Sequence, residues 1–348
     1  MKGENNLYVM DQKQIISSMR QRPHLFILGA GATKATIPNG DKNGLQSPVM
    51  DNFLEEIGLK GLLNGVELET TSHNIEAIYS ELYGKKGYED VVKMIEDGIV
   101  NHYSRMQIPD NPTLYDYLIL SLRNKDCIAS FNWDPLLIQA YNRVNKITKN
   151  LPQMLFLHGC VEVGLCEECG MFGPLRNKHC PICEKDFVMP KLMFPISNKN
   201  YSQNIFIKNQ WNRFDNYIQK AGIITIWGYS APESDIDAKE RMFTAFSSVF
   251  RKLDSIEIID IADENTINDK WEPFISETNY HFRQHKSLME SIIAEFPRRS
   301  MDGYVKRYID GWWGESSLKI EECNSFDELK ELFYPLLENE KIDNYDVI

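Results

Sequence analysis

The sequence has no long apolar run and no block of basic residues. A helix that crosses a membrane needs about 20 mostly apolar residues, and the longest apolar runs, such as residues 25–28 and 223–227, are far shorter. The first residues, MKGENNLYVMDQKQ, lack the apolar centre of a signal peptide. We therefore expect a cytoplasmic protein with no membrane association.

Positive charge is scarce as well. The chain has 38 Lys and Arg residues against 50 Asp and Glu residues, which gives a formal net charge of −12. An acidic chain repels the phosphates of nucleic acids, so we do not expect direct nucleic-acid binding. A dinucleotide is still compatible with this charge, because backbone N–H groups can hold its phosphates.

Apolar residues make up 43% of the 348 residues, as in an ordinary globular protein with a substantial core. The pattern predicts a main domain over residues 23–265, preceded by a helix within residues 1–22. Apolar residues recur at helical spacing between residues 50 and 122, which we interpret as a helical insertion. Residues 266–348 are expected to form a helical extension.

A glycine-containing turn follows the first apolar run. Residues 25–28 predict a short buried strand, and Gly29, Ala30 and Gly31 come directly after it. Glycines at such a place permit a tight turn and let the backbone approach a pyrophosphate. Lys34 stands where the G-x-G-x-x-G pattern has its third glycine, so an ordinary strand-to-helix turn stays an alternative.

Polar residues follow two further apolar runs. Asn132 and Asp134 come after the run CIASF, and His158 lies at the end of the run MLFLHG. Ligands of open α/β sheets bind at the carboxyl ends of strands, so these side chains are candidates for one site. Asn132 offers both a donor and an acceptor, and His158 is a candidate general base. The alternative is a pair of hydrogen-bonded core residues.

Four of the seven cysteines occur in two Cys-x-x-Cys pairs. Cys166 and Cys169 form the first pair, and Cys180 and Cys183 form the second. Four thiolates at this spacing make the tetrahedral set that Zn²⁺ prefers, and they leave no open position for catalysis. We therefore predict a structural zinc module over residues 163–187, with unpaired thiols or disulfides as the alternative.

The strand-and-turn pattern is repeated later in the chain. The apolar run at residues 223–227 is followed by Gly228 and Ser230. The next run, SIEII, is followed by Asp260 and Asp263. A carboxylate at a strand end can bind the hydroxyls of a ribose, and the alternative for either acid is a helix N-cap or a solvated loop residue.

In their order along the chain, these segments resemble the motifs of the Sir2 (sirtuin) family. The similar segments are GAGAT at 29–33, SFNWD at 130–134, FLHG at 156–159, the two cysteine pairs, and GYS at 228–230. The resemblance covers roughly residues 20–265. It implies an α/β fold with a Rossmann-like parallel sheet that binds NAD, and a small zinc module.

The resemblance also implies roles for individual residues. Asn132 and His158 would be the catalytic pair, and Asp134 would bind the carboxamide of nicotinamide. The pyrophosphate would lie against Gly29, Ala30, Gly31 and Thr33. Gly228 and Ser230 would contact the nicotinamide-side ribose or the phosphates, and Asp263 would bind the adenosine ribose.

Two elements of sirtuin deacylases are absent. The Pro-x-Phe-Arg element after the glycines is replaced by IPNGDKNG, and the Phe-Gly-Glu element after the zinc module by KLMFPISNKNY. In this the chain is similar to bacterial SIR2-like NAD hydrolases of antiphage defence. We therefore predict an NAD⁺ hydrolase that releases nicotinamide and ADP-ribose, or a cyclised ADP-ribose, and that is gated by homo-oligomerisation or a sensor protein. The alternatives are an NAD-dependent deacylase or ADP-ribosyltransferase, and a non-catalytic nucleotide sensor.

Overall fold

The structure is a computed structural model that describes residues 12–194, 204–232, 235–311 and 323–342. Its centre is a six-stranded sheet in the order β3-β2-β1-β6-β7-β8, and every neighbouring pair is parallel. The strands are β1 (His24–Leu28), β2 (Cys127–Ser130), β3 (Gln153–Phe156), β6 (Ile223–Trp227), β7 (Ser255–Ile259) and β8 (Phe282–His285). This is the Rossmann order, in which the chain reverses its direction of travel between β1 and β6.

The apolar runs form strands because helices cover the sheet on both sides. All residues of β1, β2, β6 and β7 are buried, as expected for a parallel sheet between two helical layers. The helices around the sheet are α2 (Ala30–Thr36), α6 (Leu114–Leu120), α7 (Leu136–Val144), α8 (Ile205–Lys220), α9 (Ile236–Ser247) and α10 (Glu264–Glu277). Among them α6 packs on α7, and α9 lies between α8 and α10.

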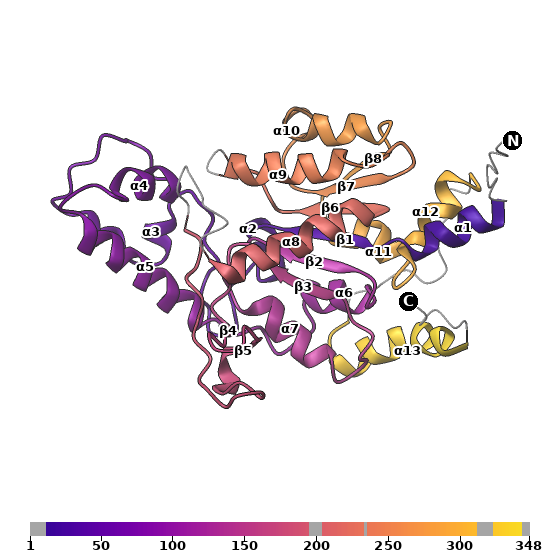
Figure 1. The fold of residues 1–348 in the computed structure, drawn as a ribbon, viewed down its shortest axis with the longest axis horizontal. Coiled ribbons are helices and arrows are strands. Elements are labelled where there is room, and N and C mark those ends of the chain that lie inside the picture. Colours follow the sequence, from indigo (N-terminus) through magenta and orange to yellow (C-terminus); the bar gives the residue numbers. More distant parts are fainter. Residues whose placement is uncertain (1–11, 195–203, 233–234, 312–322, 343–348) are drawn as a thin grey trace, which may run out of the picture.

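The stretch predicted as a helical insertion divides into two parts. The helices α3 (Phe53–Glu56), η1 (Lys60–Leu63), α4 (Ile75–Leu82) and α5 (Glu89–Ser104) form an arm that extends away from the sheet at the left of Figure 1. The last helix of the stretch, α6, packs on α7 beside the sheet instead. The cysteine pairs lie in a separate small unit with the antiparallel strands β4 (Val163–Leu165) and β5 (Phe172–Pro174), followed by η2 (Leu175–Asn177).

The sequence predicted a helical C-terminal part, but the structure also has a strand there. Residues 282–285, FRQH, form strand β8, which pairs with β7 at the edge of the sheet. The segment has one buried residue in four and no apolar run, so it lacks the pattern of a buried strand. The remaining elements are helical: η4 (Leu288–Glu290), α11 (Ile292–Glu295), α12 (Ser300–Tyr308) and α13 (Phe326–Ile342). Helix α12 packs on the N-terminal helix α1 (Gln12–Gln21).

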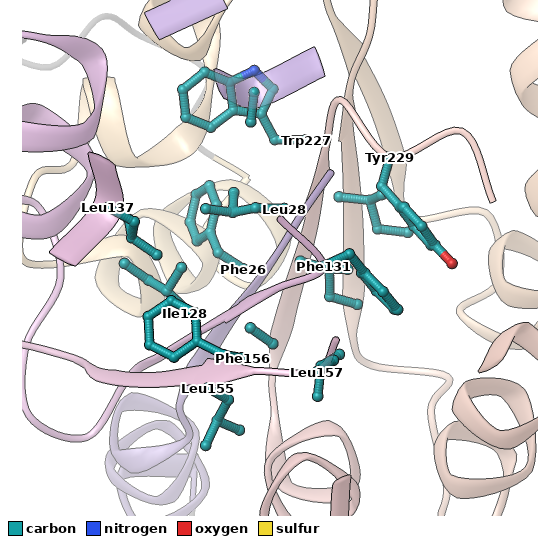
Figure 2. Packing of buried hydrophobic residues seen from close by; sticks show 14 of the residues in the cluster. Phe26, Leu28, Ile128, Phe131, Leu137, Leu155, Phe156, Leu157, Trp227 and Tyr229 are labelled. Carbon is teal, nitrogen blue, oxygen red and sulfur yellow. The ribbon is translucent and has the colours of Figure 1, made fainter. Parts of the chain in front are cut away.

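The apolar core continues past the carboxyl ends of the strands. Figure 2 shows Phe131, Leu157 and Tyr229, which follow β2, β3 and β6, packed together with core residues of the strands. Backbone hydrogen bonds continue here too, from Phe131 N to Leu28 O (2.9 Å) and from Leu157 N to Ser130 O (2.8 Å). The segments after the strands are therefore held in fixed positions. None of the helices within the described ranges combines the length and the apolarity that a membrane span requires.

Candidate functional site

A cavity of about 560 Å³ lies at the carboxyl ends of the strands. Five neighbouring strands each place a residue on its wall: Gly29 after β1, Asn132 after β2, His158 after β3, Gly228 after β6 and Asp260 after β7. The cavity thus includes the point between β1 and β6 where the strand order reverses, which is where open α/β sheets bind ligands. Ala30, Gly31, Asp134 and Ser230 also line it.

The glycines after β1 and β6 let the two turns pack against each other. Gly31 N donates to Gly228 O at 2.9 Å. A Cβ on Gly29 would lie 2.5 Å from Gly228 O, and a Cβ on Gly228 would lie 2.2 Å from Ala32 N. Gly228 also has a φ of 60°, which favours glycine. Close packing of the two turns therefore requires these glycines. Because they have no side chains, the backbone itself forms this part of the cavity wall.

Asn132 is held by its two amide hydrogens. Its Nδ2 donates to Gly29 O and to Thr33 Oγ1, each at 2.9 Å. The amide has no further hydrogen to donate, so Oδ1 is the atom with which the side chain can accept a hydrogen bond from a ligand. The half-buried Asn132 is therefore oriented as a fixed acceptor on the cavity wall.

Thr33 is fully buried behind this wall and organises its polar groups. Its hydroxyl donates to Asp134 Oδ2 at 2.8 Å, which leaves its lone pairs to accept from Asn132 Nδ2 and from the hydroxyl of Tyr115 at 2.7 Å. A hydroxyl group has one hydrogen and two lone pairs, so Thr33 makes its full set of bonds. The structure therefore places Thr33 as a support for Asn132, and it does not line the cavity as the pyrophosphate role would require.

Asp134 reaches the cavity with both carboxylate oxygens already in use. Oδ2 accepts from Thr33, and Oδ1 accepts from Leu136 N at 3.0 Å in the first turn of α7. Burial raises the pKa of this carboxyl group, and the hydrogen bond from Thr33 opposes the rise. Each oxygen keeps one further lone pair, so a ligand amide can still be accepted.

His158 is 5% exposed and lies among aromatic and acidic side chains. Its ring meets Phe131 edge-on, with ring centres 4.8 Å apart. Its Nε2 atom lies 3.7 Å from Oδ1 of Asp235, another buried residue on the cavity wall. Asn132 and His158 therefore share one cavity, as the resemblance implied.

The structure does not bring Asp263 to the cavity. Asp263 is the N-cap of α10, and its carboxylate accepts from Thr266 N at 3.1 Å and from Thr266 Oγ1 at 2.6 Å. Asp260, three residues earlier at the end of β7, lines the cavity instead. Asp235 was also missed, because it follows β6 by eight residues in the segment APESD, where an acid at the start of a helix is usually a cap.

The four predicted zinc ligands lie together. Their Sγ atoms lie within 4.8 Å of one another, and four of the separations are between 3.2 and 3.5 Å. Ligands about 2.3 Å from a tetrahedral zinc ion are about 3.8 Å apart, so this set fits the ion with small shifts, whereas a disulfide requires about 2.05 Å. A hydrogen bond from the backbone of Cys169 is the main cause that lowers the pKa of Cys166, which favours its thiolate, whereas hydrogen bonds with the thiols of Cys180 and Cys166 raise the pKa of Cys169.

The zinc module has its own small core and stands apart from the cavity. Cys166 and Cys180 are buried with Phe187, while none of the four cysteines is among the residues lining the cavity. A Zn²⁺ ion held there would be structural, because four sulfur ligands close its shell.

No protein-family model matches the chain, and no curated protein matches it. The chain is similar to solved Sir2 structures. A Sir2 homologue in complex with ADP-ribose is 14% identical, with a TM-score of 0.41 over 88% of this chain and 100% of that chain. A Sir2 homologue–NAD complex is 13% identical, with a TM-score of 0.36 over 87% and 95% of the two chains.

Sir2 bound to an acetylated peptide is similar at the same level, with 14% identity and a TM-score of 0.36 over 87% of this chain and 99% of that chain. Similarity as low as this carries neither activity nor substrate over to the chain. Its function therefore has to be derived from the residues of the cavity.

Proposed function

We propose that the protein is an NAD⁺ hydrolase of the Sir2 family, which cleaves the bond between nicotinamide and ribose. The observation that carries this proposal is the placement of Asn132 and His158 on one cavity at the reversal point of the sheet, together with the glycine turn to which Asn132 is hydrogen-bonded. A volume of about 560 Å³ is in the range of small-molecule and cofactor sites.

The reaction needs a held ribose and a positioned water rather than strong acid catalysis. Nicotinamide leaves as a neutral ring, because the electron pair of the broken C–N bond cancels its positive charge. Water forms the new bond to the ribose carbon, and its proton passes to His158 as general base. Asn132 Oδ1 accepts from a ribose hydroxyl or from that water, which fixes the reacting geometry.

We assign the remaining binding roles to residues that reach the cavity. Backbone groups at Gly29, Ala30, Gly31 and Gly228 would lie against the pyrophosphate, with Ser230 beside them. Asp134 would accept from the nicotinamide carboxamide. Asp260 takes the place of Asp263 as the acid for the adenosine ribose, since Asp263 is used in capping α10.

An NAD-dependent deacylase is the second candidate, and one observation favours it. A second cavity of about 440 Å³ lies beside the zinc module, and Met193 lines both cavities. The wall of this second cavity includes the apolar and aromatic side chains of Tyr79, Leu165, Leu192 and Phe194, which would suit an acyl chain or a peptide. The absence of the Phe-Gly-Glu element favours the hydrolase; part of the segment in that place, residues 195–203, lies outside the described residues.

The test is nicotinamide release from NAD⁺ by the purified full-length protein, with and without an acyl-lysine peptide. We expect release without peptide, and its loss in Asn132→Ala and His158→Ala. Asp260→Ala should raise KM, whereas Asp263→Ala, which alters a helix cap, should leave KM unchanged. Release that requires the peptide would identify a deacylase, and wild-type activity in both alanine variants would refute the assigned site.

We further propose that the enzyme acts in bacterial antiphage defence by depleting NAD, and that an oligomer or a sensor protein gates it. The departures from the deacylase motifs support this setting. Cells that express the protein should lose NAD after phage infection, and cells that express His158→Ala should not. Equal NAD levels in the two strains during infection would contradict the proposal.

A further inference from the structure

Among the described residues, the carboxyl group of Asp235 lies beside the imidazole of His158. Oδ1 of Asp235 lies 3.7 Å from Nε2 of His158. The two residues are 4% and 5% exposed, so water screens their charges poorly. Asp235 also lines the cavity, immediately before α9 begins at Ile236.

Aromatic side chains hold both members of this pair. The hydroxyl of Tyr229 donates to Asp235 Oδ2 at 3.0 Å. The Tyr229 ring stacks on Phe131, with ring centres 4.1 Å apart and planes within 3°. Phe131 also contacts the ring of His158, which meets it edge-on. One aromatic ring thus sets the positions of the base and, through Tyr229, of the carboxylate.

We propose that Asp235 is the positioning residue for His158, a role that rests on the hydrolase function proposed above. Its carboxylate selects the tautomer with the hydrogen on Nε2, which leaves the lone pair on Nδ1 for the incoming proton. When the N–H bond at Nδ1 forms and the O–H bond of the water or hydroxyl breaks, Asp235 stabilises the resulting imidazolium.

The separation in the structure is longer than a hydrogen bond, which requires 2.7–3.2 Å. Catalytic hydrogen bonds are often long without the substrate and shorten in its complex. The separation of 3.7 Å exceeds the upper limit of that range by about 0.5 Å, so a small movement of either side chain closes it. Even without closure, the buried carboxylate attracts the imidazolium more than it does the neutral ring.

Steady-state kinetics on the full-length protein test the role. Asp235→Asn keeps the shape and the acceptor for Tyr229 but removes the charge. We expect kcat to fall about 100-fold, with KM changed by less than about threefold. The acidic limb of the pH profile should move to lower pH by about one unit, because His158 loses the charge that favours its protonated form. Asp237→Asn removes an exposed charge from the same helix and should match wild type.

A second measurement does not depend on turnover. Nitrogen-15 NMR of the histidine rings, assigned with His158→Ala, gives the titration midpoint of His158 in the wild type and in Asp235→Asn. We expect the midpoint to be lower in the variant by about one pH unit. If the variant does not fold, Tyr229→Phe, which loosens the carboxylate but keeps its charge, should lower kcat about tenfold.

The outcomes separate the two proposals. Equal NMR midpoints, or an Asp235→Asn enzyme with wild-type kcat and an unmoved acidic limb, would overturn the role of Asp235. Wild-type kcat in Tyr229→Phe would do the same where Asp235→Asn fails to fold. If the protein never releases nicotinamide but the NMR midpoint of His158 is lower in Asp235→Asn, the hydrolase function is refuted and the interaction between His158 and Asp235 is confirmed.

Discussion

Replacing Thr33 with valine tests how the wall of the cavity is held together. Valine has the shape of threonine but no hydroxyl, so no cavity forms and only the hydrogen bonds are lost. Tyr115 and Asp134 are 1% and 4% exposed, and each would lose its bond to Thr33. A buried polar group left without its partner costs about 1–3 kcal/mol, so we expect a loss of about 3 kcal/mol from the two. Asn132 is half-buried and is excluded from this sum, because it can turn towards the cavity.

The same change should weaken function through Asn132. Without Thr33 Oγ1, one amide hydrogen of Asn132 has no acceptor, and the side chain is free to rotate away from its fixed orientation. We expect a lower Tm by roughly 4 °C, at about 1.4 °C per kcal/mol for a chain of this length, and a higher KM for NAD. Thr33→Ser keeps the hydroxyl and is the matched control in thermal melts and in nicotinamide release. Valine and serine variants that differ by less than about 0.5 kcal/mol would refute the reasoning.

Three further predictions concern parts of the fold outside the cavity. Burial lowers the pKa of His24 to about 4. Its contribution to stability is therefore complete above about pH 6.5 and should fall by up to about 3 kcal/mol as the pH drops towards 4. Urea titrations of wild type and His24→Gln check this, and an equal dependence of the unfolding free energy on pH in the two proteins would contradict it. Purified protein should hold about one zinc ion per chain by elemental analysis, and Cys180→Ser should lose the metal together with part of its thermal stability; a metal-free wild type that melts at the same temperature would count against the zinc module. Arg298 is fully buried and donates to Glu340 of α13 and to the carbonyls of Leu120, Leu122 and Asn150. Glu340→Gln should therefore lower the free energy of unfolding in urea by about 3 kcal/mol, near the lower end for breaking a buried ion pair. A loss below about 0.5 kcal/mol would show that this ion pair does not anchor α13.

The strands near the cavity could be predicted because burial on both faces leaves a clear pattern. Residues 25–28, 127–130 and 223–227 are short apolar runs, and each is a fully buried strand of the sheet. Strand β8 could not be found in this way, because its half-buried residues are polar and it lies at an edge where one neighbour suffices. The cysteine spacing predicted the four-cysteine cluster for a different reason, since each Cys-x-x-Cys pair brings two thiols together on one tight turn.

Acidic residues of the cavity were harder to assign, because a sequence shows how far an acid is from a strand but not which donor it meets. Asp260 and Asp263 follow the same strand, and both are plausible as ribose ligands or as caps. The structure separates them: the N–H groups at the start of α10 engage Asp263, and Asp260 is left at the strand end on the cavity wall. Asp235 shows the converse, since its place before α9 is typical of a cap, yet α9 makes no side-chain cap bond with it. Its carboxylate is directed by Tyr229 towards His158 instead. The hydrogen bonds of an acid at a helix start therefore indicate its role better than its position in the sequence does. The kinetics of Asp235→Asn and Asp237→Asn, two acids at the start of α9, test this directly.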